Sequence, residues 1–276
     1  MKKSNFEEKI SLVFANKLGY KLYDAMNYSL VSSGKRFRPN LIFTVADVLG
    51  IDSEVMEEVA IAIELIHTYS LIHDDLPCLD DDSLRRGVAT NHVVYGEDYA
   101  LLAGDNLQSV AFEYIYKALD NGFDIKLLKF FARACSRMVE GQSLDIDENF
   151  KTNVSKLEQV HRLKTGALIE FCMVAPLFYI KDYSKFDQLL NVGENIGLAF
   201  QIRDDILDVL YDSEQLGKSS SDIDNNKITY PSFLGVDASC EKLEQILDDT
   251  IKILMSIECY SEDFENLIKY CRNRNR

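Results

Sequence analysis

Two acidic stretches hold the side chains best suited to chemistry. The first contains Asp74, Asp75 and Asp80, and the second contains Asp204 and Asp208. Each lies at the end of a long apolar segment, where a solvated acidic surface is not expected. Carboxylates this close repel one another and are costly to bury without a compensating charge. Hard divalent cations such as Mg²⁺ take oxygen ligands and are held by a few carboxylates together with substrate phosphates. The two stretches therefore predict divalent-metal sites.

The spacing within each stretch allows a pair of carboxylates to face one cation. Asp204 and Asp208 are four residues apart, so on a helix they share one face, about 6 Å apart along the axis. Asp74 and Asp80 are six residues apart and would lie on different faces of an unbroken helix. Pro77 disturbs a helix, and a break there could bring Asp80 back toward Asp74. The alternative, a pair of solvated helix ends, is disfavoured because acidic groups at a helix C-terminus oppose the helix dipole.

Basic residues accompany the acidic stretches. Arginine binds phosphate oxygens through a planar fork, and lysine acts as a point charge. Carboxylates that hold Mg²⁺ beside such cations predict a diphosphate site, although any one of these side chains alone could be a solvated surface charge. Lys164 differs from the others because it interrupts an apolar stretch. The chain contains no Gly-x-x-x-x-Gly-Lys-[Ser/Thr] motif, which argues against a P-loop enzyme. The basic residues are Lys35, Arg36, Arg38, Arg85, Arg86, Lys164, Lys218 and Lys227.

The composition disfavours several classes of partner. The chain has 276 residues, of which 47% are hydrophobic and 27% charged, as is typical of a globular protein. Its formal net charge of −15 disfavours nucleic acid and anionic membranes as partners. No uncharged run is longer than ten residues, so we expect no membrane span. The charged N-terminus lacks the apolar stretch of a signal peptide, and the six cysteines form no Cys-x-x-Cys pair. We therefore expect a cytoplasmic protein with reduced thiols.

Apolar residues recur at intervals of three and four throughout the chain, which predicts an all-α protein. The chain shows no linker, fixed repeat or low-complexity tract, so we expect a single domain over residues 1–276, a large bundle of ten or more helices. The segment from Val59 to Ile72 is apolar nearly all round and should form a central helix. Helices are expected over residues 6–17, 20–31, 39–49, 53–72, 99–119, 125–140, 155–180, 185–210, 228–236, 241–257 and 261–272, with a loop over residues 212–226.

These residues resemble the motifs of the trans-isoprenyl diphosphate synthase family, a group of polyprenyl synthetases. The resemblance extends from Gly34 to the end of the chain, and the four-residue spacer between Asp75 and Asp80 is similar to that of the bacterial farnesyl diphosphate synthase type. The motifs are Gly34-Lys35-Arg36-Phe37-Arg38-Pro39, Asp74-Asp75-(four residues)-Asp80 with Arg85-Arg86-Gly87, Leu102-Ala103-Gly104-Asp105, Gly141-Gln142, Lys164-Thr165-Gly166, Phe200-Gln201-(two residues)-Asp204-Asp205-(two residues)-Asp208, and Lys227-Ile228-Thr229-Tyr230-Pro231.

The resemblance implies a prenyltransferase of the isoprenoid synthase fold, with helices around a central substrate cavity, that works as a homodimer. It implies head-to-tail condensation of isopentenyl diphosphate with dimethylallyl or geranyl diphosphate, giving mainly farnesyl diphosphate. The reaction would need Mg²⁺, with three ions when substrate is bound. The implied metal ligands are Asp74, Asp80 and Asp204, supported by Asp75 and Asp208.

The resemblance also implies roles for the basic and polar residues. The allylic diphosphate would be held by Arg85, Lys164 and Lys218, with Lys227 as a second lysine of the same loop. The isopentenyl diphosphate would be held by Lys35, Arg38, His67 and Arg86. The allylic carbocation would be stabilised by the backbone of Lys164 and by Thr165 and Gln201. On this basis His67 is a substrate ligand rather than a core histidine.

Product length should depend on Tyr69, which lies five residues before Asp74 and so just over one helical turn away. A bulky aromatic side chain there should stop the growing tail at C15, unless Tyr69 is an ordinary core residue. Geranyl and geranylgeranyl diphosphate synthases are the alternatives within the family. Outside it, a terpene cyclase is disfavoured by the form of the second acidic motif, and a non-catalytic subunit by the presence of both motifs.

Overall fold

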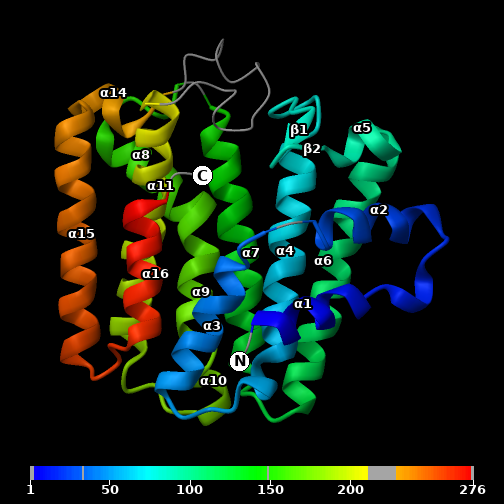
Figure 1. Cartoon of the computed structure of the whole chain (residues 1–276), viewed down its shortest axis with the longest axis horizontal. Helices are drawn as coiled ribbons and strands as arrows, with labels where there is room; N and C mark the ends of the chain where they lie inside the picture. Colours follow the sequence, from blue (N-terminus) through cyan, green and yellow to red (C-terminus); the bar gives the residue numbers. More distant parts are fainter. Residues whose placement is uncertain (1–2, 33, 148, 211–227, 275–276) are drawn as a thin grey trace. The chain divides into compact units, whose positions relative to one another are not determined.

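The computed structural model of the chain is almost entirely helical and describes residues 3–32, 34–147, 149–210 and 228–274 (Figure 1). The all-α prediction is confirmed. The structure divides into two compact units. The first unit contains Met1–Pro39 and Ser53–Asn121, and the second contains Asn40–Asp52, Gly122–Asp212 and Asn226–Arg276. The single domain expected over residues 1–276 stays a prediction.

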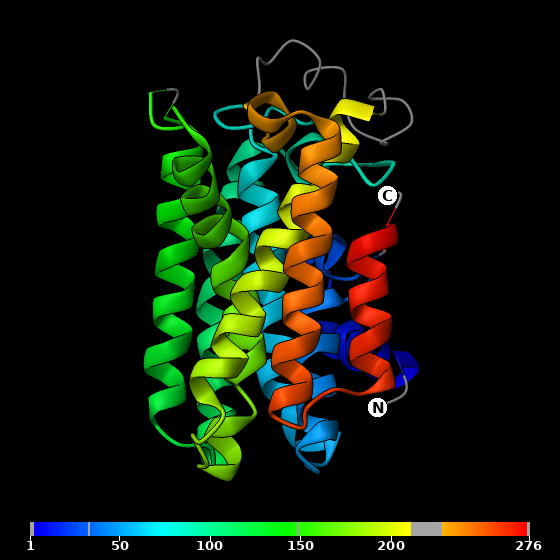
Figure 2. The ribbon, with the colours of Figure 1, turned by 90° about the vertical axis from the view of Figure 1, so that its left-hand side faces the viewer.

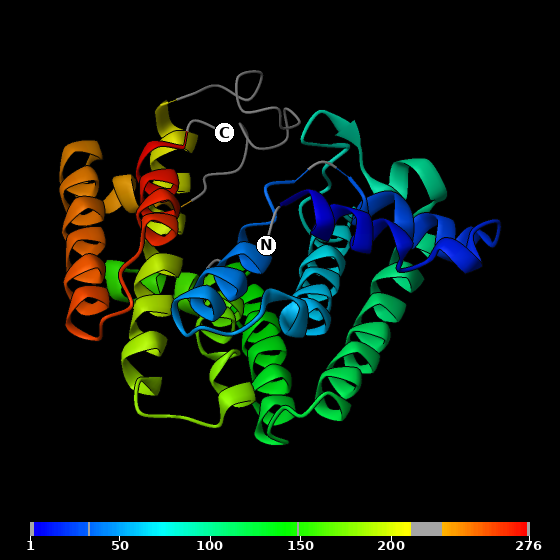
Figure 3. The ribbon, with the colours of Figure 1, turned by 60° about the horizontal axis from the view of Figure 1, so that its bottom comes forward.

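The first unit is organised around two long helices that lie side by side, α4 and α6 (Figure 1). Two shorter helices, α1 and α2, pack against each other, and α2 also packs against α4 and α6; both are blue in Figure 3. The described elements of this unit are α1 (Lys3–Leu12), η1 (Ala15–Lys17), α2 (Lys21–Leu30), η2 (Ser53–Met56), α4 (Glu57–Asp74), β1 (Leu84–Arg85), β2 (Val88–Ala89), α5 (Asn91–Tyr95) and α6 (Glu97–Asp120).

Helix α4 is buried on nearly every side, as its apolar sequence predicts. Every residue from Val59 to Ile66 is buried. Helix α6 faces it with small residues, and a Cβ atom on Gly104 would lie only 2.0 Å from Nε2 of His73 on α4. Nε2 of His73 also lies 3.0 Å from the carbonyl oxygen of Leu101. The glycine at position 104 therefore makes room for His73, one residue before the first acidic motif.

A short hairpin follows α4 and was not predicted. Its strands β1 and β2 are antiparallel and pair Leu84 with Ala89 and Arg85 with Val88. The two turn residues, Arg86 and Gly87, have φ values of +55° and +76°. Positive φ at both central positions is the geometry of a type I′ turn, which suits the twist of a hairpin. Strands of two residues are too short to give an alternating pattern in the sequence.

The second unit is organised around α11, which packs against α9 and α15 (Figure 2). The chain passes from the first unit into the second within α3 (Phe37–Val48). The remaining described elements of this unit are α7 (Lys126–Asp145), α8 (Val154–His161), η3 (Arg162–Gly166), α9 (Ala167–Val174), α10 (Leu177–Ile180), α11 (Phe186–Leu210), α14 (Tyr230–Leu234), α15 (Val236–Ser256) and α16 (Glu262–Asn273).

The predicted helix over residues 155–180 contains a wide turn. The segment η3 between α8 and α9 is a π-helix. By length and composition Val154–Ile180 could cross a membrane, but 72% of its most apolar window is buried inside the structure. Burial of that extent is typical of a core helix in a soluble protein.

Candidate functional site

The turn after α4 brings two aspartates of the first acidic motif close together. The backbone N–H of Asp80 donates to the carbonyl oxygen of Asp74 at 2.9 Å. The chain turns back at Pro77, and Leu79 donates to the carbonyl of Leu76 at 2.9 Å. Asp74 is half-buried and Asp80 is exposed. The backbone at position 80 thus returns to the end of α4, although the two positions are six residues apart.

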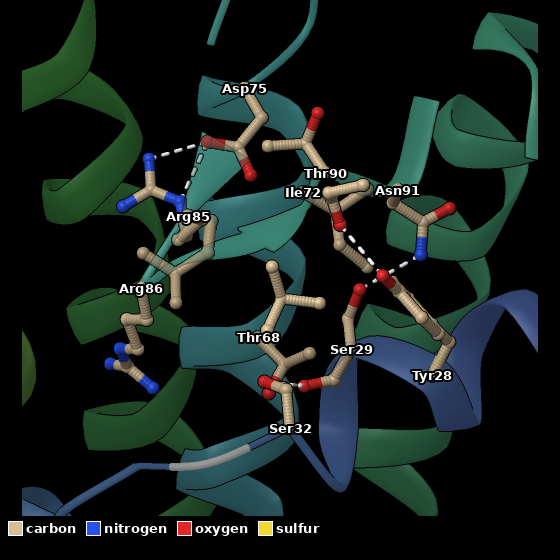
Figure 4. A pocket seen from close by; sticks show the side chains of 13 residues that line it. Tyr28, Ser29, Ser32, Thr68, Ile72, Asp75, Arg85, Arg86, Thr90 and Asn91 are labelled. Carbon is tan, nitrogen blue, oxygen red and sulfur yellow. Dashed lines mark hydrogen bonds and ion pairs between the residues drawn. The ribbon is translucent and has the colours of Figure 1, made fainter. Parts of the chain in front are cut away.

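Asp75, between these two aspartates in the chain, has a different environment. Its side chain is buried and forms an ion pair with Arg85, with Oδ1 lying 2.5 Å from Nη2 and 2.6 Å from Nε (Figure 4). Burial raises the pKa of Asp75 to about 6, although the hydrogen bond and the charge of Arg85 act in the opposite direction. Asp75 therefore fixes Arg85 next to the motif, which agrees with a supporting role.

Hydrogen bonds hold the hairpin that carries Arg85 and Arg86 against α2. The Tyr28 hydroxyl donates to the carbonyl oxygen of Ala89 at 2.8 Å, and the Asn91 amide donates to Ser29 Oγ at 2.8 Å. These residues line a small pocket beside Asp75 (Figure 4). The end of β2 and the start of α5 are thereby joined to α2.

Several arginines surround His67 in the first unit. The pKa of His67 lies well below its ordinary value, first because the ring is desolvated and then because of the charges of Arg38, Arg86, Arg85 and Arg36. A Cβ atom on Gly34 would lie 2.7 Å from Nη1 of Arg86, so the loop before α3 lies directly against that guanidinium. The structure therefore brings three predicted substrate ligands, His67, Arg38 and Arg86, into one positively charged region. Lys35 is exposed.

Arg36 lies inside the basic motif but serves a structural purpose. Only 5% of Arg36 and 5% of Glu64 is exposed, and Nη1 of Arg36 lies 2.7 Å from Oε1 of Glu64. The guanidinium also donates to Glu7 and to the carbonyl oxygens of Leu30 and Ser32. Its φ of +47° is unusual for a residue with a side chain. Arg36 thus anchors the loop that carries Lys35 and Arg38.

We expect Arg36→Met to lower the free energy of unfolding by about 3–5 kcal/mol, because it leaves Glu64 as an unpaired buried charge. Urea denaturation of both proteins measures the difference. The control is Glu7→Gln: because 42% of the Glu7 side chain is exposed, its loss should change stability by less than about 1 kcal/mol. Equal effects from the two substitutions would contradict this role for Arg36.

Tyr69 lies on α4 below the first acidic motif. Only 4% of it is exposed, and its ring contacts the His73 ring edge to face with 5.6 Å between centroids. His73 in turn contacts the carbonyl oxygen of Leu101, and its ring occupies the space that a side chain at position 104 would fill. Tyr69 is therefore fixed in the interior of the first unit, on the helix that ends at Asp74.

In the second unit, the π-turn η3 brings two predicted catalytic residues to α11. The Thr165 hydroxyl donates to Oε1 of Gln201 at 2.9 Å. A π-turn holds one more residue than an α-helical turn, and such turns occur frequently at functional sites. Lys164 lies in the same turn, which packs against α7 and α11. The spacing of apolar residues does not reveal this turn, because one inserted residue hardly disturbs it.

The ammonium group of Lys164 is held by a residue that we did not predict. Nζ of Lys164 lies 2.7 Å from Oδ2 of Asp145, and Nζ of Lys151 lies 2.7 Å from Oδ1 of the same carboxylate. Burial alone would raise the pKa of Asp145, but the two lysines outweigh it and hold the pKa well below its ordinary value. The sequence contained one clue to the role of Asp145. It lies four residues after Gly141 of the Gly-Gln motif, and residues four apart on a helix share a face.

Replacing Asp145 by Asn should destabilise the protein in a pH-dependent way. Because folding lowers the pKa of Asp145 below its ordinary value of 3.8, its contribution is complete above about pH 4 and is lost as the pH falls further. We expect Asp145→Asn to lower the free energy of unfolding by about 1.5–3 kcal/mol near pH 7. Urea denaturation near pH 7 and again below pH 4 checks this, and a difference that does not shrink in acid would contradict it.

The second acidic motif lies on α11, so Asp204 and Asp208 share a helix face as predicted. Asp204 is paired with Arg274, whose Nη2 lies 2.8 Å from Oδ1. The Arg274 guanidinium also stacks over the Phe200 ring, 4.2 Å from its centroid, and Arg203 Nε donates to the Arg274 carbonyl at 3.0 Å. The sequence does not show this contact, because its partners lie 70 residues apart.

Asp205, the middle acid of that motif, is buried and structural. Its Oδ2 accepts a hydrogen bond from the backbone N–H of Tyr230 at 2.8 Å and lies 3.1 Å from Nε2 of His161. The Tyr230 hydroxyl donates to Glu158. Asp205 therefore joins α14 and α8 to α11, as a supporting residue would.

The carboxylate oxygens present suit a hard cation. Within residues 3–274, apart from the gaps already given, no three His, Cys, Asp or Glu side chains converge on one point. Mg²⁺ does not require such a cage, because it keeps several waters and binds one or two carboxylates plus substrate phosphates. In the first unit Asp74 and Asp80 would supply those carboxylates, and in the second Asp204 and Asp208 would. The predicted ligands Lys218 and Lys227 lie outside the described residues.

Known proteins that are similar to this chain in sequence and structure indicate its family. The polyprenyl synthetase family profile matches residues 20–264. The farnesyl diphosphate synthase of Micrococcus luteus is 42% identical over 263 residues, covering 93% of this chain and 90% of that protein. The geranylgeranyl diphosphate synthase of Cyanophora paradoxa is 39% identical over 266 residues, covering 92% and 88%. The crystal structure of the Thermotoga maritima geranyltranstransferase superposes with a TM-score of 0.84 at 33% identity, covering 99% and 98%. The predicted isoprenoid synthase fold is confirmed.

Proposed function

Because this chain belongs to the polyprenyl synthetase family, we propose that it condenses isopentenyl diphosphate head to tail with dimethylallyl or geranyl diphosphate, giving mainly farnesyl diphosphate. The chain is a prenyltransferase. One observation of the structure supports the proposal most directly. At the end of α4 the backbone of Asp80 returns to Asp74, next to a buried Asp75–Arg85 pair and the arginines around a neutral His67. Carboxylates for a metal and cations for a diphosphate thus occur in one unit.

In the first unit we assign binding of metal and of isopentenyl diphosphate. Asp74 and Asp80 would hold Mg²⁺, with Asp75 in support through Arg85. Lys35, Arg38, His67 and Arg86 would bind the isopentenyl diphosphate. His67 suits this role because its lowered pKa keeps the ring neutral, so that it donates a hydrogen bond to phosphate without adding a charge.

In the second unit we assign the residues nearest the reacting carbon. Asp204 would hold Mg²⁺, supported by Asp208, and Lys164 would bind the allylic diphosphate. The motifs assign Arg85, Lys218 and Lys227 to the same substrate. Thr165 and Gln201 are already joined by a hydrogen bond. Their dipoles, with the Lys164 carbonyl, would stabilise positive charge on the allylic carbon.

The reaction then follows from these assignments. Bound Mg²⁺, as a cluster of three ions, would neutralise the diphosphate leaving group. Arg85 and Lys164 would stabilise the same charge as the allylic C–O bond breaks. The double bond of isopentenyl diphosphate attacks the allylic carbon and forms the new C–C bond, and a proton is lost to the departing pyrophosphate. No side chain has to act as a nucleophile.

We further propose a cytoplasmic homodimer that binds no nucleic acid and does not span a membrane. A row of exposed apolar side chains on α6 supports the dimer: Leu101, Leu102, Phe112 and Tyr116 are 48%, 52%, 38% and 63% exposed. Apolar patches of this kind on soluble proteins commonly mark protein interfaces. Analytical ultracentrifugation should give twice the mass of the chain, and a monomer at micromolar concentration would exclude the proposal.

Product analysis tests the proposed function. Purified protein is incubated with Mg²⁺, isopentenyl diphosphate and either dimethylallyl or geranyl diphosphate, and the products are separated by chain length. A C15 product that disappears with EDTA supports the proposal. A C10 or C20 product would support the proposed reaction but contradict the proposed C15 product length. The similarity to a geranylgeranyl diphosphate synthase makes a C20 product the main alternative. No elongation by folded protein would point instead to a cyclase or a partner-dependent subunit.

A further inference from the structure

We propose that two glycines, Gly141 on α7 and Gly197 on α11, are positioning residues for the π-turn that carries Lys164 and Thr165. Each would act with a polar residue four positions later on its own helix, Asp145 or Gln201. The inference rests on the proposed function, because it assigns Lys164 and Thr165 to the allylic substrate. The two glycines would affect the reaction indirectly, through the position of the η3 backbone.

The close approach of the backbones is the first observation. A Cβ atom on Gly197 would lie 2.7 Å from the Cα of Gly166 in η3. A Cβ atom on Gly141 would lie 2.1 Å from the backbone nitrogen of Lys164 and 2.6 Å from the carbonyl carbon of Leu163. All of these atoms belong to the backbone, so no side-chain rotation relieves the contact. The wide turn is therefore in contact on two sides with helix surfaces that carry no side chain.

The hydrogen bonds on the same two helices are the second observation. On α7, Asp145 lies one turn after Gly141 and binds Nζ of Lys164 at 2.7 Å. On α11, Gln201 lies one turn after Gly197 and accepts from the Thr165 hydroxyl at 2.9 Å. Residues four apart on a helix share a face. Each helix thus supplies space for the backbone of the turn and a partner for one of its side chains.

These contacts fix both the place and the direction of the reactive groups. If the backbone of η3 moved away from either glycine, Lys164 or Thr165 would also move away from its polar partner. Misplacement of a substrate-positioning group by about 1 Å can cost on the order of a hundredfold in rate. The glycines therefore matter to the reaction beyond their contribution to packing.

The chain offers a matched pair of variants on one helix. A Cβ atom on Gly193 would lie 2.7 Å from the Cα of Glu170, as close as the Cβ of Gly197 to the Cα of Gly166. Glu170, however, lies on α9 and outside η3. Gly193→Ala and Gly197→Ala should therefore destabilise the protein to a similar extent, and only Gly197→Ala should disturb the π-turn.

Steady-state kinetics at a temperature where both variants are folded test the proposal. For Gly197→Ala we expect kcat to fall by about a hundredfold and the KM for the allylic diphosphate to rise, while the KM for isopentenyl diphosphate stays within twofold. For Gly193→Ala we expect all three constants to stay within about twofold. Equal losses in the two variants, or a kcat for Gly197→Ala within threefold of the parent, would overturn the proposal.

A second variant keeps the test decisive if Gly197→Ala does not fold. Asp145→Asn adds no volume and removes the negative charge that pairs with Lys164. It should raise the KM for the allylic diphosphate at least threefold and leave the KM for isopentenyl diphosphate unchanged; equal effects on both, or none, would overturn the proposal. If the parent protein itself forms no C–C bond, the proposed function fails, whereas an active parent with indistinguishable Gly193 and Gly197 variants rejects only the positioning role.

Discussion

Asp74→Ala is expected to lower kcat for condensation by a factor on the order of a thousand, and EDTA should abolish the activity of the parent protein. Removing one group that stabilises developing charge typically costs a hundred- to a thousandfold. Asp74 is the carboxylate at the end of α4 to which the backbone of Asp80 returns. Its loss removes a proposed Mg²⁺ ligand at the point where the diphosphate leaves.

Asp204→Ala in the second unit should have an effect of the same size. Rates of product formation measured over a range of Mg²⁺ concentrations would show whether added metal rescues either variant in part. The control is Asp81→Asn, because Asp81 is an exposed neighbour in the same acidic stretch and asparagine tolerates its φ of +53°. Asp81→Asn should leave kcat within about threefold. If Asp74→Ala retained a tenth of the parent activity, the metal assignment would be wrong.

Tyr69→Ala is expected to shift the main product from C15 to C20 or longer. Tyr69 is buried on α4, five residues before Asp74, so that it lies below the proposed metal site along the helix axis. An aromatic ring at this depth would block the end of a growing prenyl tail. Removing the ring would let the tail extend past α4 before product release. Chromatography of the dephosphorylated products measures the shift directly.

Two controls separate product length from damage to the core. Tyr69→Phe keeps the ring, which contacts His73 edge to face, and should leave the C15 product unchanged. Tyr69→Ala should cost about 3–5 kcal/mol of stability, as large-to-small core substitutions do, so the assay is run well below its melting temperature. An unchanged product distribution in a folded Tyr69→Ala protein would reduce Tyr69 to an ordinary core residue.

The sequence predicted the parts of the structure that depend on local pattern. The burial of α4 followed from its apolar residues, and the return of the chain toward Asp74 followed from Pro77. The shared face of Asp204 and Asp208 followed from their spacing on α11. In each case the cause lies within a few residues of the effect, so the sequence alone was sufficient.

The features that were missed depend on contacts between distant residues or on very short elements. The role of Asp145 depends on the packing of α7 against η3. This packing places the Asp145 carboxylate next to Lys164. The pairing of Asp204 with Arg274 joins residues 70 positions apart. The two-residue strands β1 and β2 and the single wide turn η3 are too small to alter the spacing of apolar residues. The roles assigned to the site residues stay predictions until the variants are measured.

The contact between Gly104 and His73 has a consequence for how such a sequence can diverge. Because a Cβ at position 104 would lie 2.0 Å from the imidazole of His73, a larger residue there requires that the histidine side chain move or be replaced by a smaller one. A smaller side chain at position 73 would therefore make larger residues at position 104 easier to accept. We expect the two positions to covary among homologues, and a library that randomises both positions should yield more folded clones with a large residue at position 104 when position 73 is small.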